Sequence, residues 1–105
     1  ALLEISHGRQ ACSKLNARFG RKDVLAKAMH SGRCGLYLRV IREGEAQAGD
    51  PMLLTERPYE DWPIARVFAL LIGGGHKRDP AGVAALARTA VLAEAWRGRA
   101  EKLAR

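Results

Sequence analysis

The sequence has few residues of the types that bind zinc or form disulfides. Only two cysteines and three histidines occur among its 105 residues. Two cysteines are too few for the disulfide framework of a small secreted domain, so we expect both thiols to be reduced. The histidines stand singly and no Cys-x-x-Cys pair is present. This pattern argues against a structural zinc site.

The chain also lacks a membrane-spanning segment and a nucleotide-binding loop. No apolar run approaches the roughly 20 residues that a helix needs to cross a bilayer, and no signal-peptide pattern opens the sequence. No Gly-Lys-Ser/Thr follows the triglycine at 73–75, which excludes a Walker loop. We therefore expect a cytoplasmic location and no membrane partner.

What is present is an ordinary globular composition with a basic excess. Hydrophobic residues make up 48% and charged residues 28%, which argues against disorder. The net charge of +7 is spread evenly, with nine basic against five acidic residues in 1–50 and nine against six in 51–105. Nucleic-acid binders more often concentrate their charge on one face. The charge pattern therefore does not favour a nucleic-acid partner.

The most informative stretch is residues 8–20, GRQACSKLNARFG. Cys12, Leu15 and Phe19 fall on one face of a helix that begins near the cysteine, and Gly20 can end that helix. The spacing predicts that this face points inward. A cysteine in this position is either a reactive thiol or a small buried hydrophobe, and the spacing leaves both interpretations open.

The surroundings of Cys12 are strongly basic. Lys14 and Arg18 lie four residues apart, and no acidic residue occurs between Glu4 and Asp23. Neighbouring cations and a helix N-terminus both favour the thiolate form of a cysteine. The same groups would hold an anion such as a phosphate close to the sulfur.

Alternating residues predict strands on both sides of this stretch. Residues 2–6 place Leu3 and Ile5 on one side, and residues 33–41 place Cys34 on an all-apolar side as a buried core thiol. The run 52–57 is also strand-like. Strands this short and closely connected suggest a small barrel.

Helical spacing dominates elsewhere. Asp23 is positioned to cap a helix with Leu25, Ala28 and Met29 inward, ending at Gly32. After a linker at 58–62, a stripe at 64, 67, 68 and 71 predicts a helix that ends at the triglycine. Asp79-Pro80 is a typical helix start, and no strong breaker follows before Leu103. No His, Cys or carboxylate pair converges in this helical region, which we predict to be a packing or interaction unit.

The runs ACSKLNARFG and SGRCGLYLRVIREGEAQAGD together resemble the second half of a MOSC domain, the family named after the C-terminal domain of molybdenum-cofactor sulfurase. More narrowly they resemble its bacterial YiiM type. The resemblance implies an α+β fold, the C-terminal part of a small MOSC-type β-barrel followed by a small three-helix domain. Residues 1–58 would be the barrel half and 59–105 the helical appendage, divided into three helices by a bend at 89–93. The N-terminal half of the barrel is absent from this sequence.

The resemblance also implies a function. Cys12 matches the family's cysteine that coordinates the molybdenum of the molybdenum cofactor (molybdopterin), and Lys14, Asn16 and Arg18 match positions that would contact or support the cofactor. Family members reduce N-hydroxylated bases and related compounds. The implied partners are the missing N-terminal half, a small N-hydroxylated substrate and a flavoprotein electron donor. We expect the 105 residues alone to be inactive.

Two other functions remain open at this level. The helices after Trp62 could form a basic helical nucleic-acid-binding module, with residues 97–105 touching phosphates. However, Ala93, Glu94 and Ala95 offer little for reading bases. Alternatively, Cys12 could carry sulfur as a persulfide in a sulfur-carrier domain. Metal analysis with and without Cys12 separates these functions.

Overall fold

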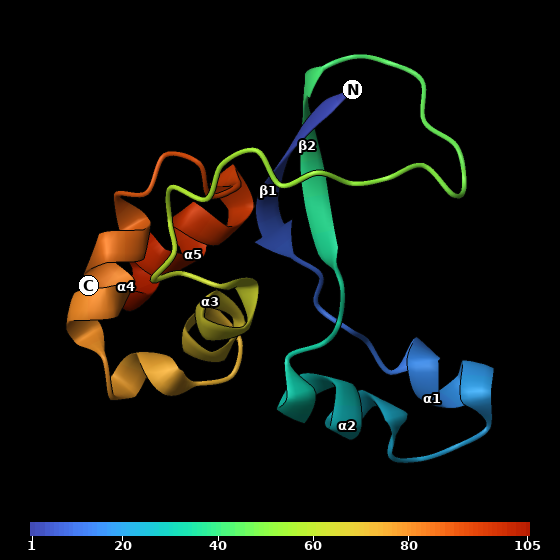
Figure 1. Ribbon diagram of the computed structural model, residues 1–105. Coiled ribbons are helices and arrows are strands. Elements are labelled where there is room, and N and C mark those ends of the chain that lie inside the picture. Colours follow the sequence, from blue (N-terminus) through green and yellow to red (C-terminus); the bar gives the residue numbers. More distant parts are fainter.

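The structure is a computed structural model that describes residues 1–105, and it contains a two-stranded antiparallel sheet and five α-helices (Figure 1). The elements in chain order are β1 (Leu2–Gly8), α1 (Lys14–Phe19), α2 (Val24–Ser31), β2 (Leu36–Arg42), α3 (Ile64–Leu71), the 3-10 turn η1 (Gly75–Lys77), α4 (Pro80–Ala87) and α5 (Glu94–Leu103). The predicted α+β class is confirmed. None of the helices has the length and apolar character needed to span a lipid bilayer.

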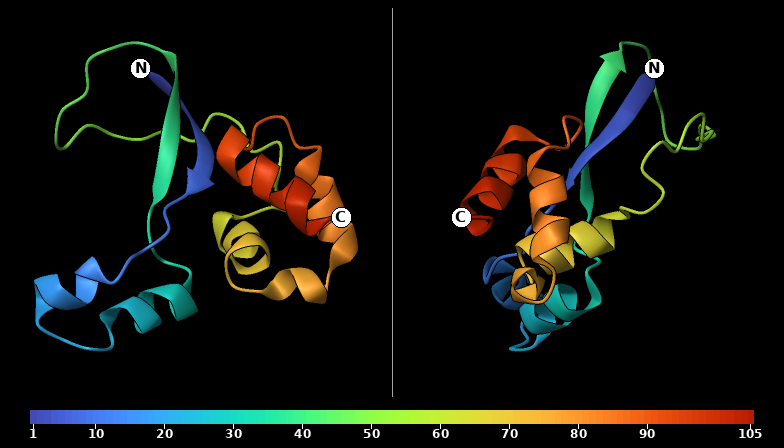
Figure 2. Two further views of the ribbon diagram at one scale, coloured as in Figure 1. Left: turned by 180° about the vertical axis from the view of Figure 1, so that it is seen from behind. Right: turned by 90° about the vertical axis from the view of Figure 1, so that its left-hand side faces the viewer.

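The two strands form a hairpin whose connection is long and carries α1 and α2. The two ends of this connection lie side by side, because Gly8 pairs with Leu36 and the backbone N–H of Arg9 donates to the carbonyl of Gly35 at 2.9 Å. In Figure 2, α1 and α2 extend beyond the end of the hairpin, while α3–α5 lie beside it. The segment predicted to carry the chemistry therefore protrudes from the sheet.

Glycines end both helices of this protruding segment, as predicted. Gly20 follows α1 with φ +62° and Gly32 follows α2 with φ +69°, left-handed conformations that cost glycine little. The predicted cap of α2 is wrong in detail, because the Asp23 side chain makes no cap hydrogen bond. Its carboxylate instead pairs with Arg21 at 2.8 Å and Lys27 at 2.9 Å.

The helices α3, α4 and α5 form the core of the structure. The apolar stripe predicted for residues 64–71 is confirmed, and the Asp79 side chain caps α4 by accepting a hydrogen bond from Gly82 at 2.9 Å. The predicted bend is also present, since α4 ends at Ala87 and α5 begins at Glu94. The nine core residues are Val67, Phe68, Leu70, Leu71, Val83, Leu86, Leu92, Trp96 and Ala100. All nine lie within residues 64–103, which we call the helical unit.

The sheet alternates as predicted, but the helices cover the other face. Residues directly opposite each other share a face, so Leu3 lies with Val40 and Ile5 with Leu38. This apolar face is open to solvent: the exposed fractions are 45% for Leu3, 49% for Ile5, 41% for Leu38 and 58% for Val40. No element of residues 1–105 covers this face, as expected for half of a barrel whose further strands are missing. The helical unit instead packs against the face of Ser6 and Gly8, which are both buried.

The strand predicted at 52–57 is absent. This stretch has no regular structure, and the exposed fractions of Met52, Leu53 and Leu54 are 87%, 83% and 71%. A strand needs a neighbour to satisfy its backbone N–H and C=O groups, and no neighbour pairs with this stretch. The apolar composition of this stretch is typical of a strand, but residues 1–105 contain no partner strand for it.

Candidate functional site

Cys12 lies in the short linker between β1 and α1, and its side chain is exposed and free. The helix begins two residues later, at Lys14, and the Cys12 carbonyl accepts a hydrogen bond from the backbone of Leu15 at 3.1 Å. The thiol is therefore next to the first turn rather than inside it. An exposed thiol can reach a ligand without any rearrangement of the chain.

The inward face predicted for Cys12, Leu15 and Phe19 is wrong within these residues. Helix α1 has no buried residue, and 64% of Phe19 is exposed. Helical spacing correctly grouped the apolar side chains, but no element of the chain covers them. The interpretation of Cys12 as a small buried hydrophobe does not fit this geometry.

Asn16 has a structural contact that sequence reasoning did not find. Its side-chain Oδ1 accepts a hydrogen bond from the backbone N–H of Leu25 at 2.9 Å, in the first turn of α2. Asn16 thus provides the cap that we had expected from Asp23. The two residues lie nine positions apart, too far for a local capping pattern to reveal the contact.

The cations of the segment that carries Cys12 differ in whether they form ion pairs. Arg21 and Lys27 both pair with Asp23, and the hydrogen bonds from Lys27 and then Arg21 lower the pKa of the Asp23 carboxyl to about 2. Lys14 and Arg18 are exposed and make no ion pair. Because they need no acidic neighbour, these two side chains are available to an anion near the thiol.

Cys34 occupies a different environment. It lies before β2 rather than on it, is half-buried and packs against the core of the helical unit. Its Sγ donates to the carbonyl of Ala28 at 3.4 Å. This arrangement fits a packing thiol, although its burial is less complete than predicted.

The structure brings no cluster of metal ligands together. No three His, Cys, Asp or Glu side chains are close enough to hold an ion. A metal at Cys12 would therefore receive one soft sulfur ligand from residues 1–105.

A cavity lies beside this segment. It is an open, mostly polar hollow of about 640 Å³ that runs along α5, and Gln10 and Ile72 are among the residues that line it. Gln10 is two residues before Cys12. The cavity joins positions far apart in sequence, so no local pattern predicts it.

The basic residues of α5 are partly occupied by the helical unit itself. Arg97 donates to the carbonyls of Ala90 and Leu92, at 3.1 and 3.3 Å, and Arg99 donates to that of Leu71 at 2.6 Å. These bonds satisfy carbonyls at helix ends and in a turn. They reduce the number of donors that α5 could offer to nucleic-acid phosphates.

Comparisons with known proteins place these observations in a family. The family described as "MOSC domain" matches residues 1–53, half of the chain. The crystal structure of YiiM from Geobacillus stearothermophilus is similar over 100% of this chain, with a TM-score of 0.86 and 31% identity, and the match covers 53% of that chain. The MOSC/YiiM-like fold is therefore shown for all of the described residues.

Two curated proteins are also similar. A protein of Gibberella moniliformis named "Reductase" is 41% identical over 66 residues, which are 63% of this chain and 12% of that protein. The "Uncharacterized protein YflK" of Bacillus subtilis is 31% identical over 97 residues, which are 92% of this chain and 43% of that protein. This chain spans about half or less of the length of each relative. The family match to residues 1–53 and the similarity to YiiM and YflK together show that the chain belongs to the MOSC domain family.

Proposed function

We propose that residues 1–58 form the C-terminal half of a MOSC-type β-barrel and that residues 59–105 form a three-helix appendage. The family match ends at residue 53, and the helical core lies entirely beyond residue 66, which supports a boundary between them. The open apolar face of the hairpin and the exposed apolar run at 52–54 are the surfaces that further barrel strands would cover. An N-terminal segment of a longer polypeptide is the occupant that we propose for this face.

The proposed function is molybdenum-cofactor-dependent reduction of N-hydroxylated compounds, with Cys12 as the molybdenum ligand. The observation that carries it is the exposed Cys12 thiol in a segment that also carries Lys14 and Arg18, two exposed cations without ion pairs. Lys14 and Arg18 would bind the anionic part of the cofactor, while Asn16 holds α1 against α2 and so fixes the helix that carries them.

The reaction class follows from the family and from one relative's name. Part of the chain is similar to a protein named "Reductase". Reducing an N-hydroxyl group to N–H takes up two electrons and two protons and releases water. When bound, the molybdenum cofactor would supply the redox centre, and we propose a flavoprotein as the source of electrons. The chain's own part would be ligation through Cys12 and orientation of the cofactor.

Metal analysis tests this function. The complete protein and its Cys12→Ser and Cys34→Ser variants would be purified and assayed for molybdenum, pterin and reduction of a simple N-hydroxylated base. We expect Cys12→Ser to lose metal and activity together, because the oxygen of serine is a poor substitute for a soft sulfur ligand. Cys34→Ser is the matched control and should retain both.

The alternatives give different results in the same experiment. Full molybdenum loading of Cys12→Ser would refute the ligand role. Sulfur that a thiol reductant releases from Cys12, in a protein without molybdenum, would identify a persulfide carrier instead. Tight, salt-sensitive binding of DNA or RNA without any metal would favour the nucleic-acid module.

A further inference from the structure

The segment that carries Cys12 is held at both ends by the helical unit. Residues 9–35 leave the sheet after Gly8 and return to it at Leu36, and these two residues pair with each other. On one side of this junction the chain meets Trp96 of α5 and Ile64 of α3. On the other side, Met29 and Cys34 pack against the helical core. The appendage therefore contacts the chain before and after the candidate site.

The tightest of these contacts is at Gly8, the last residue of β1. A Cβ atom placed on Gly8 would lie 3.0 Å from Trp96 Cη2 and 3.1 Å from Ile64 Cγ2, closer than side chains normally approach. Gly8 is buried, so the strand can lie this close to the indole only because it has no side chain here. The chain then runs four residues to Cys12.

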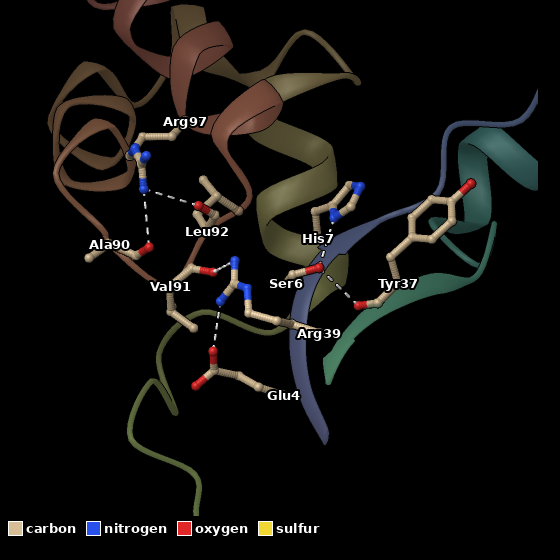
Figure 3. Close-up of polar contacts among 9 residues, drawn as sticks. All are labelled: Glu4, Ser6, His7, Tyr37, Arg39, Ala90, Val91, Leu92 and Arg97. Carbon is tan, nitrogen blue, oxygen red and sulfur yellow. Dashed lines mark hydrogen bonds and ion pairs between the residues drawn. The ribbon is translucent and has the colours of Figure 1, made fainter. Parts of the chain in front are cut away.

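Trp96 is itself fixed by its surroundings. Only 7% of it is exposed, its ring centroid lies 6.4 Å from that of Phe68, and His7 meets it edge-on at 5.7 Å. The turn before α5 is tied to the same strand, because the Ala93 N–H donates to the Ser6 carbonyl at 2.9 Å. Figure 3 shows the neighbouring polar contacts: Arg39 reaches the Val91 carbonyl, and the Ser6 hydroxyl lies between His7 and the Tyr37 carbonyl. Because the Trp96 ring is packed on several sides, it limits where Gly8 can lie.

We infer that Trp96 is a positioning residue for the Cys12 segment, acting through its contact with Gly8. The helical unit then sets the direction in which the chain leaves β1, and with it the placement and accessibility of the thiol. This assigns the appendage a role in the chemistry although it contributes no reacting group. The inference builds on the proposed function through the choice of Cys12, but the contact can be tested without any metal or cofactor.

The test is a double-mutant cycle between Gly8→Ala and Trp96→Phe in the full chain. The second-order rate of Cys12 alkylation by iodoacetamide is measured by peptide-resolved mass spectrometry, with Cys34 as the internal reference. In Gly8→Ala the added Cβ crowds the indole and Ile64, so the strand or these side chains must shift by a few tenths of an ångström. The Cys12 rate should then change by about threefold or more, as expected for residues in direct contact. Trp96→Phe removes the ring atoms nearest Gly8 and should restore part of the rate when it is combined with Gly8→Ala, while the contact with Ile64 remains.

The matched control is Gly98→Ala on the same helix, where an added Cβ meets nothing within 4 Å. It should leave the Cys12 rate unchanged. An unchanged Cys12 rate in folded Gly8→Ala, or no restoration in the double variant, overturns the inference. If Gly8→Ala does not fold, Trp96→Phe alone decides: a changed rate at Cys12 with an unchanged rate at Cys34 supports positioning, and two unchanged rates overturn it. Molybdenum loading is measured separately, so failure of the proposed function is distinguishable from failure of this contact.

Discussion

The guanidinium of Arg39, on β2, donates a hydrogen bond to the carbonyl of Val91 in the turn between α4 and α5, across 3.2 Å. The same side chain pairs with Glu4 on β1 at 2.7 Å. One arginine therefore joins both strands to the helical unit, as Figure 3 shows. Through this contact and that of Ser6 with Ala93, the helices cover the more polar face of the sheet and leave its apolar face open.

Replacing Arg39 should loosen this attachment. In Arg39→Lys the charge opposite Glu4 remains, but a single ammonium group cannot bond both Glu4 and the Val91 carbonyl as the planar guanidinium does. We expect a loss of about 0.5–1.5 kcal/mol in the free energy of unfolding, the net value of one hydrogen bond. Urea denaturation measures it. The nearby Arg42→Lys variant serves as a control, and equal stability of the two variants would contradict the joining role.

Removing the cap at Asn16 should destabilise the Cys12 segment. Asn16→Ala loses the acceptor for the Leu25 N–H, at a cost of about 1 kcal/mol, whereas Asn16→Asp keeps an acceptor and should be close to the original. Hydrogen exchange at the Leu25 amide measures the effect locally. Equal exchange in the Ala and Asp variants would show that the side-chain bond does not support α2.

Asp23 should give a small acid-dependent contribution to stability. Its pKa is lowered to about 2 by hydrogen bonds from Lys27 and then Arg21, so the folded state binds the proton less tightly than the unfolded state. The stabilisation is present above about pH 4 and is lost as the pH falls toward 2. Comparison with Asp23→Asn between pH 2 and 5 should show a steeper fall for the unmodified protein. Added salt should weaken the difference, because the pairs are on the surface.

The two cysteines should differ in reactivity. Cys12 is exposed, while Cys34 is half-buried and bonded to the Ala28 carbonyl. Iodoacetamide should therefore label Cys12 faster in the folded protein, and the difference should disappear in denaturant. Equal labelling of the two thiols under native conditions, or faster labelling of Cys34, would reverse the assignment of the reactive thiol.

The open apolar face predicts where a longer polypeptide covers this chain. Lysine at Ile5 or Leu38 should destabilise the complete protein by about 2 kcal/mol or more, because a charge would be buried beneath the proposed N-terminal segment. Ala26→Lys, on an exposed position of α2, is the control. Thermal unfolding measures the three variants. If all three match the original protein, the face is not covered.

Local patterns were sufficient for much of this fold. Helical spacing gave the stripe of Val67, Phe68 and Leu71, and the Asp79-Pro80 pair gave the start of α4, because both depend on residues within one or two turns. Gly20 and Gly32 ended their helices as predicted, since a left-handed residue at a helix end favours glycine. The runs around Cys12 and Cys34 indicate the MOSC family from the sequence alone.

The tertiary structure decided what the sequence left open, above all which faces are covered. Alternation shows that Leu3 and Ile5 share a face, but only the docking of Val91 and Ala93 shows that the helical unit covers the opposite face. In the same way, the bond from Leu25 to Asn16 joins residues nine positions apart. Sequence by itself determined the local elements and the candidate thiol, because these depend on neighbouring residues. Their partners depend on long-range contacts, and those exist only once the chain has folded.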